Sequence, residues 1–152
     1  MQNDFLWPLG EQRAEYLSSP STILLVDDDP DMRSLTRTFL EHEGYRVFSS
    51  GNAERAVHIF SRVPRIDLLI TDLYMPGRSG MELAAELKAL RPGLPVLMIS
   101  GGFVDGGQKS QLQLDGWRFL GKPFQLTELL ALVHVMLELA GAERGRVADG
   151  RV

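Results

Sequence analysis

The chain has 152 residues, of which 44% are hydrophobic and 24% charged, so its composition is that of a soluble globular domain and excludes a disordered or fibrous protein. It has no cysteine, which excludes disulfides, cysteine-ligated metals and thiol catalysis and suits the cytoplasm. The net charge of −4 argues against direct nucleic-acid binding, and no apolar run is long enough to span a membrane. We therefore expect a single cytoplasmic domain.

The predicted elements begin after an N-terminal arm, residues 1–20, that has no regular hydrophobic period. From there, short apolar runs alternate with stretches of helical period. The predicted strands are Thr22–Val26, Tyr45–Ser49, Ile66–Thr71, Pro95–Ser100 and Trp117–Leu120. The predicted helices run from Pro30 to a stop at Gly44, onward from a cap at Asn52, around Leu83–Leu90, weakly between Gly106 and Leu114, and over Gln125–Leu139. The Gly- and Arg-rich residues 141–152 are predicted to form a flexible tail.

The apolar strands are continuous rather than alternating, which predicts a parallel sheet covered by helices on both faces. Five such strands and five helices indicate an α/β, flavodoxin-like, doubly wound fold with a five-stranded parallel sheet in the order 2-1-3-4-5. Folds of this kind bind ligands beyond the carboxyl ends of their strands. We therefore look for chemistry at the residues that follow each strand.

Polar residues suited to one reaction occupy these strand ends. Asp27, Asp28 and Asp72 are expected to lie together, and three close carboxylates repel one another unless a cation shares the site. Oxygen ligands of this type suit Mg²⁺. Ser100 adds a hydroxyl and Lys122 an ammonium. Together they form a carboxylate nucleophile, a cation site and two groups that can stabilise a transferring phosphoryl group.

With these residues in place, the sequence resembles the receiver domain of two-component response regulators over residues 21–140. No single motif carries the resemblance, which depends on four motifs that follow one another at the family's separations. They are Ile23–Pro30 (ILLVDDDP), Leu69–Gly77 (LITDLYMPG), Val96–Gly101 (VLMISG) and Phe119–Phe124 (FLGKPF).

The resemblance implies a role for each matched residue. Asp72 would be the phosphoacceptor and, with Asp28 and the backbone carbonyl of Tyr74, a Mg²⁺ ligand, while Asp27 would support the metal mainly through water. Lys122 and Ser100 would hold phosphoryl oxygens. The switch residues would be Ser100 and Phe119, the second of which stands where the family keeps an aromatic side chain that changes rotamer.

The resemblance also implies the reaction and the partners. A histidine kinase or histidine phosphotransfer protein would donate a phosphoryl group to Asp72, and the resulting acyl phosphate would switch protein–protein contacts. The chain would catalyse its own phosphorylation and dephosphorylation, but because it consumes its own side chain we do not expect a turnover enzyme.

Several alternatives remain beside this interpretation. The chain could be a pseudo-receiver that binds proteins constitutively, a receiver excised from a hybrid histidine kinase, or an aspartyl-phosphate phosphohydrolase. The phosphohydrolase would need a second acid close after Asp72, where Leu73 and Tyr74 stand. Phe119 could be a plain core residue, and Asp29 is interpreted as a helix cap.

The last predicted helix carries more apolar residues than one buried face requires. One predicted stripe consists of Leu126, Leu129, Leu130, Val133 and Leu137, and off it lie Leu132, Val135, Met136 and Leu139. The second set suggests a homodimer or a kinase contact through this helix, or a face covered by the N-terminal arm.

Overall fold

The structure, a computed structural model, describes residues 19–101 and 117–148. Five parallel strands form one sheet in the order β2-β1-β3-β4-β5, which confirms the predicted topology. The strands are β1 (Thr22–Val26), β2 (Arg46–Ser50), β3 (Leu68–Asp72), β4 (Val96–Ser100) and β5 (Arg118–Gly121). Because all five run in the same direction, their carboxyl ends meet at one edge of the sheet.

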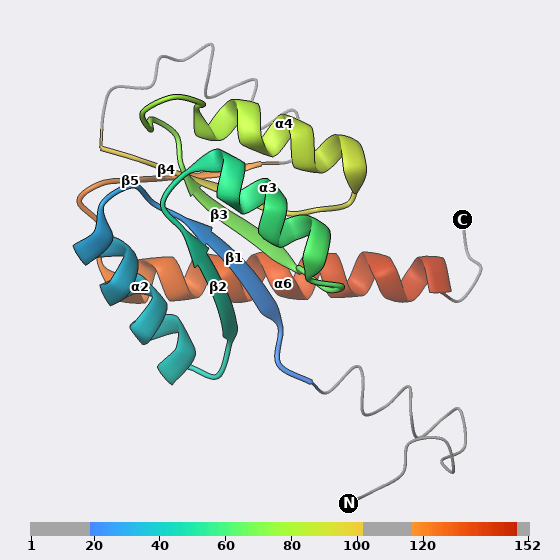
Figure 1. The fold of residues 1–152 in the computed structure, drawn as a ribbon. Helices are drawn as coiled ribbons and strands as arrows, with labels where there is room; N and C mark the ends of the chain where they lie inside the picture. The colour runs from blue at the N-terminus through green and yellow to red at the C-terminus, as the bar shows by residue number, and fades with distance from the viewer. Residues whose placement is uncertain (1–18, 102–116, 149–152) are drawn as a thin grey trace, which may run out of the picture.

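Helices cover both faces of the sheet (Figure 1), with α2 and α6 on one face and α3 and α4 on the other. Their bounds are α2 (Pro30–His42), α3 (Ala53–Arg62), α4 (Gly80–Leu90) and α6 (Leu126–Ala148). None of these helices of the described chain combines the length and the apolar character needed to cross a bilayer. The weak helix predicted between Gly106 and Leu114 lies outside the described residues, as does the arm up to residue 18.

The core consists of two layers because the central strands bury both of their faces. In β1, Ile23 and Leu25 pack into the layer beneath α2 and α6, whereas Leu24 and Val26 pack into the layer beneath α3 and α4. All four side chains are almost completely buried. This two-sided burial explains why the strands read as continuous apolar runs in the sequence.

The helices α2 and α3 begin where the sequence predicts, because capping side chains fix their first turns. Asp29 caps α2 by accepting hydrogen bonds from the backbone N–H groups of Asp31 and Met32, and Pro30 occupies the first helical position. This confirms the interpretation of Asp29 as a helix cap. Asn52 likewise accepts from the N–H of Arg55 and starts α3. The caps place the start of α2 directly after the acidic end of β1.

Two predictions about the last helix are wrong. The helix continues to Ala148, where the sequence predicts its end at Leu139 and a flexible tail from Gly141. Each glycine costs a helix only about 1 kcal/mol, and the Ala, Glu and Arg residues around Gly141 and Gly145 are good helix formers. In addition, Met136 is only 5% exposed and packs in the core with Leu129 and Val133, since the buried face follows these residues at helical spacing.

Candidate functional site

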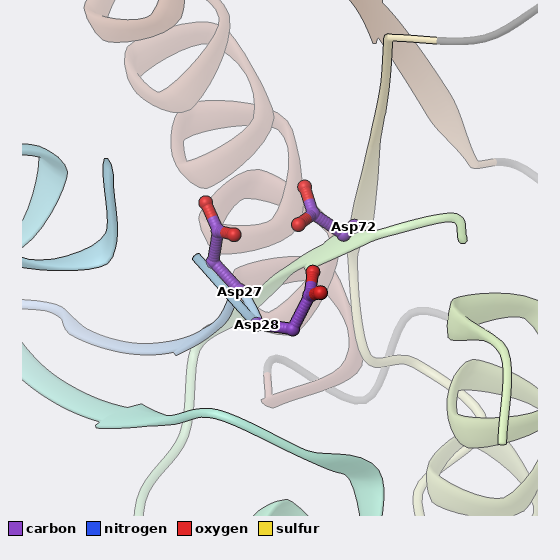
Figure 2. Close-up of side chains that lie close together, drawn as sticks. All are labelled: Asp27, Asp28 and Asp72. Carbon is purple, nitrogen blue, oxygen red and sulfur yellow. The ribbon is translucent and has the colours of Figure 1, made fainter. Parts of the chain in front are cut away.

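Three carboxyl groups meet at the carboxyl edge of the sheet. Asp27 and Asp28 follow the last residue of β1 directly, and Asp72 is the last residue of the neighbouring strand β3. Figure 2 shows the three side chains gathered around one space, and each offers an oxygen atom within 4.8 Å of the others. Asp27 and Asp72 are buried, whereas Asp28 is exposed. The structure therefore brings together the three acids that the sequence singles out.

Lys122 completes the charge constellation from the end of β5. Its Nζ lies 3.2 Å from Oδ1 of Asp72 and 3.9 Å from Oδ2 of Asp27. Its backbone N–H donates to the carbonyl oxygen of Ser100 at 2.7 Å, which anchors the residue to the end of β4, and the Lys122–Pro123 peptide bond is cis. One ammonium thus lies among three carboxylates, so the site has a net negative charge.

The neighbouring charges and burial change the pKa values of Asp72 and Lys122. Burial, with a side-chain hydrogen bond to Asp27 and repulsion from its charge, raises the pKa of Asp72 to about 8, and Lys122 counteracts this only in part. For Lys122, burial disfavours the ammonium, but attraction to Asp72, Asp27 and Asp28 outweighs it and raises the pKa. At neutral pH Asp72 therefore favours holding a proton unless another cation takes its place.

A hard divalent cation fits this donor set. Carboxylate oxygens from Asp27, Asp28 and Asp72 are ligands that Mg²⁺ prefers, and the exposure of Asp28 leaves room for the water molecules that Mg²⁺ retains. Tyr74 follows Asp72 by two residues, and its side chain is 52% exposed. The role of the Tyr74 carbonyl as a ligand stays a prediction.

Binding of Mg²⁺ is expected to release protons and to tighten as the pH rises from 6 to 8, because the cation competes with the proton that Asp72 holds in the metal-free chain. By the same linkage, metal-free protein should lose stability as the pH rises from about 4 to about 8, since the folded state binds this proton more tightly than the unfolded state does. Calorimetric titrations at several pH values, in buffers of different ionisation enthalpy, measure both the affinity and the proton release. An Mg²⁺ affinity that does not change with pH would contradict the prediction.

Ser100 and Phe119 lie on the neighbouring strands, as predicted. Ser100 ends β4 and is buried, and in the register of the sheet it pairs with Gly121, the residue before Lys122. Phe119 is half-buried and packs against the core layer beneath α3 and α4. A half-buried position is compatible with both interpretations of Phe119, the core residue and the switch aromatic, so its switch role stays a prediction.

Sequence reasoning missed one residue that shapes the site. Gly80, the first residue of α4, lies against the backbone of Asp72, and a Cβ atom at this position would lie 2.0 Å from the Asp72 carbonyl oxygen. Its N–H donates to the carbonyl oxygen of Leu73 at 2.8 Å. The capping pattern of Ser79 and Glu82 marks the start of the helix in the sequence. The close approach of Gly80 to β3 appears only in three dimensions.

Comparison with known proteins identifies the family of this chain independently of the site geometry. The family described as "Response regulator receiver domain" matches residues 23–134. Among curated relatives, YbdJ of Bacillus subtilis, an uncharacterized transcriptional regulatory protein, is 34% identical over 116 residues, which make up 76% of this chain and 50% of the relative. This chain therefore spans about half the length of that relative.

Solved structures agree with the fold. A CheY-like response regulator receiver domain protein from Methanospirillum hungatei matches with a TM-score of 0.75 at 27% identity, covering 82% of this chain and 99% of that one. The response regulator TrrA of Thermotoga maritima, solved in complex with Mg²⁺-BeF, matches with a TM-score of 0.66 at 30% identity, covering 76% and 98%. The chain belongs to the response regulator receiver domain family.

Proposed function

We propose that this chain is a phosphorylation-dependent switch in a two-component or phosphorelay system, with Asp72 as its phosphoacceptor. The observation that carries the proposal is the position of the Asp72 carboxyl group, which lies beside two further acids and 3.2 Å from the Lys122 ammonium. A phosphoryl group on Asp72 would adjoin both a cation site and a fixed positive charge. Its negative charge would be compensated on two sides.

In the proposed reaction, a carboxylate oxygen of Asp72 attacks the phosphorus atom of a phosphohistidine. The phosphorus–nitrogen bond breaks, the imidazole leaves, and Asp72 becomes an acyl phosphate. Lys122 pairs with one phosphoryl oxygen, and the Ser100 hydroxyl donates a hydrogen bond to another. Mg²⁺, held by the three acids and the Tyr74 carbonyl, would neutralise charge on the phosphoryl group when bound. Because Asp72 is itself consumed, the chain is a signalling module rather than a turnover enzyme.

The surroundings of Lys122 indicate where a donor protein would approach. Lys122 lines a surface pocket of about 400 Å³ together with apolar side chains from α2 and from the start of α6. Those side chains are Met32, Leu35, Phe124 and Leu126, of which Leu35 is exposed. An apolar surface directly beside the acceptor suits a histidine kinase or a histidine phosphotransfer protein, which must dock before its phosphohistidine can reach Asp72.

Intact-mass measurement after incubation with Mg²⁺ and acetyl phosphate tests the proposal. The wild-type chain is expected to gain one phosphoryl group, and a chelator should abolish the gain. Asp72→Asn should gain nothing, because the amide lacks the nucleophilic oxygen. Asp29→Asn is the matched control: this residue caps α2 through its side-chain oxygen, and asparagine caps equally well.

If folded, Mg²⁺-binding protein takes up no phosphoryl group from acetyl phosphate, the measurement is repeated with a phosphohistidine protein as donor. Uptake on Asp72 from that donor would support the proposal with strict dependence on a kinase. Failure with both donors would overturn it in favour of a pseudo-receiver that binds proteins constitutively.

We also propose that α6 mediates homodimer formation. Val135 and Leu139 are 48% and 53% exposed, and they follow the half-buried Leu132 at the three- and four-residue spacing of one helix stripe. A second copy of the same stripe would bury these side chains in a symmetric interface.

Sedimentation analysis over the micromolar range is expected to show a wild-type dimer, which Leu139→Glu should convert to a monomer. Leu90→Glu changes a leucine on α4 that is even more exposed than Leu139, and it should leave the dimer intact. A wild-type chain that stays monomeric throughout this range would contradict the proposal.

A further inference from the structure

Arg33, in the first turns of α2, contacts the acidic site through the backbone rather than through an ion pair. Its Nη1 donates a hydrogen bond of 2.6 Å to the carbonyl oxygen of Asp27. This carbonyl belongs to the peptide unit that joins Asp27 to Asp28. The guanidinium therefore holds the one peptide plane from which two of the three acids project.

The orientation of that peptide unit decides whether the acids can converge. Consecutive side chains of a regular strand point to opposite faces, yet oxygen atoms of Asp27 and Asp28 lie within 4.8 Å of each other and of Asp72. Hydrogen bonds to neighbouring backbone groups also hold Asp27: its N–H donates to the carbonyl oxygen of Ser50 at 3.1 Å, and its Oδ1 accepts from the N–H of Asp29 at 2.9 Å. Within residues 19–101 and 117–148, the Arg33 hydrogen bond is the one that acts on the peptide between the two acids.

Gly51, in the turn between β2 and α3, leaves the space that the Arg33 guanidinium occupies. A Cβ atom at Gly51 would lie 2.8 Å from Nη1 of Arg33 and 3.5 Å from its Cζ. Positive φ angles in the described chain occur only at Gly44 and Gly77, so the backbone at Gly51 does not itself require glycine. The absence of a side chain at this position therefore has a steric consequence, which is room for the arginine head group.

We infer that Arg33 is a positioning residue for the cation site: it fixes the Asp27–Asp28 peptide so that both carboxylates face Asp72, and Gly51 makes the room that this contact needs. The inference deepens the proposed function, on which it rests, because it assigns a positioning residue to the same metal site. It also predicts a change in Mg²⁺ affinity opposite to the change that loss of a positive charge alone would cause. Removing a positive charge near three acids should tighten Mg²⁺ binding, whereas losing the positioning contact should weaken it.

Calorimetric titration of the full chain with Mg²⁺ separates the two effects. Arg33→Met is expected to weaken Mg²⁺ binding about tenfold, and Arg33→Lys should restore part of the loss because it retains a donor. Arg37→Met is the matched control. Arg37 lies one turn further along α2, carries the same charge and contacts Ser49 and Glu41 instead of the acidic site, so its loss should not weaken binding.

The partnership with Gly51 gives a second, independent test. Gly51→Ala should weaken Mg²⁺ binding in the wild-type background, because its methyl group displaces the guanidinium, but should have no further effect in the Arg33→Met background. The Gly51→Ala measurement keeps the inference testable if Arg33→Met does not fold, which a thermal melt would show. Unchanged or tighter Mg²⁺ binding by folded Arg33→Met, or by Gly51→Ala, would overturn the inference while the proposed function stands. A wild-type chain that binds no Mg²⁺ would overturn both.

Discussion

Gly80→Ala is expected to lower the free energy of unfolding by about 3 kcal/mol, since an overpacked methyl group with no room forces the backbone to move. The new Cβ atom would lie 2.0 Å from the carbonyl oxygen and 2.9 Å from the carbonyl carbon of Asp72. These are backbone atoms of a central strand, and they cannot rotate away as a flexible side chain could. Thermal unfolding should shift downward by roughly 6–12 °C for a chain of this size.

The same substitution should also impair phosphoryl uptake at temperatures where the protein is still folded, because the displaced carbonyl belongs to the acceptor residue itself. Gly93→Ala is the matched control: a Cβ atom at Gly93 meets nothing within 4 Å, so this variant should melt and react like the wild type. A Gly80→Ala variant with unchanged stability would mean that the start of α4 lies farther from β3 than the structure shows.

Lys122→Met should slow phosphoryl uptake from acetyl phosphate about 100-fold, the size of effect found when one preorganised group that stabilises a developing anion is removed. Methionine keeps an unbranched side chain of similar length but removes the ammonium that lies 3.2 Å from Asp72. Magnesium binding should persist and become tighter, since one positive charge among three acids is gone. The combination of retained metal and lost reaction distinguishes this variant from a misfolded one.

Lys88→Met provides the control for this prediction. Lys88 also donates to a protein oxygen, the carbonyl of Leu94, but it lies on α4 and outside the charge constellation. Its replacement should leave the rate of phosphoryl uptake unchanged. Equal rates for Lys122→Met and the wild type would contradict the role assigned to Lys122.

The sequence predicts the sheet and the acidic site well, because both depend on local signals. Continuous apolar runs mark strands buried on both faces, and capping residues such as Asp29 and Asn52 mark where helices begin. The topology of a parallel sheet then brings Asp27 and Asp72 to the same edge, although 44 residues separate them in the chain. Residues that follow strands are thus predictable as neighbours once the fold class is known.

The predictions that failed, and the contacts that were missed, depend on distances that the sequence pattern does not contain. The end of α6 is set by a balance between two glycines, Gly141 and Gly145, and several good helix formers. Met136 turns inward because the sheet beneath it offers a place in the core. Gly80 and Arg33 touch backbone carbonyls of Asp72 and Asp27, and a backbone carbonyl has no signature in the sequence. Such contacts become visible only when the strands and helices are placed together.

The charge of a buried acid is balanced differently at the two edges of the sheet. At the amino edge, Asp67 accepts the N–H of Thr22 at 2.8 Å and pairs with Arg65 at 2.9 Å, so its charge is balanced within the chain. At the carboxyl edge, Lys122 balances the charge of the three acids only in part. The proposed Mg²⁺ would supply the remaining positive charge, and its free concentration would then influence both the stability of the domain and its uptake of a phosphoryl group. A variant relieved of this imbalance is expected to be more stable without Mg²⁺ and less able to bind the ion.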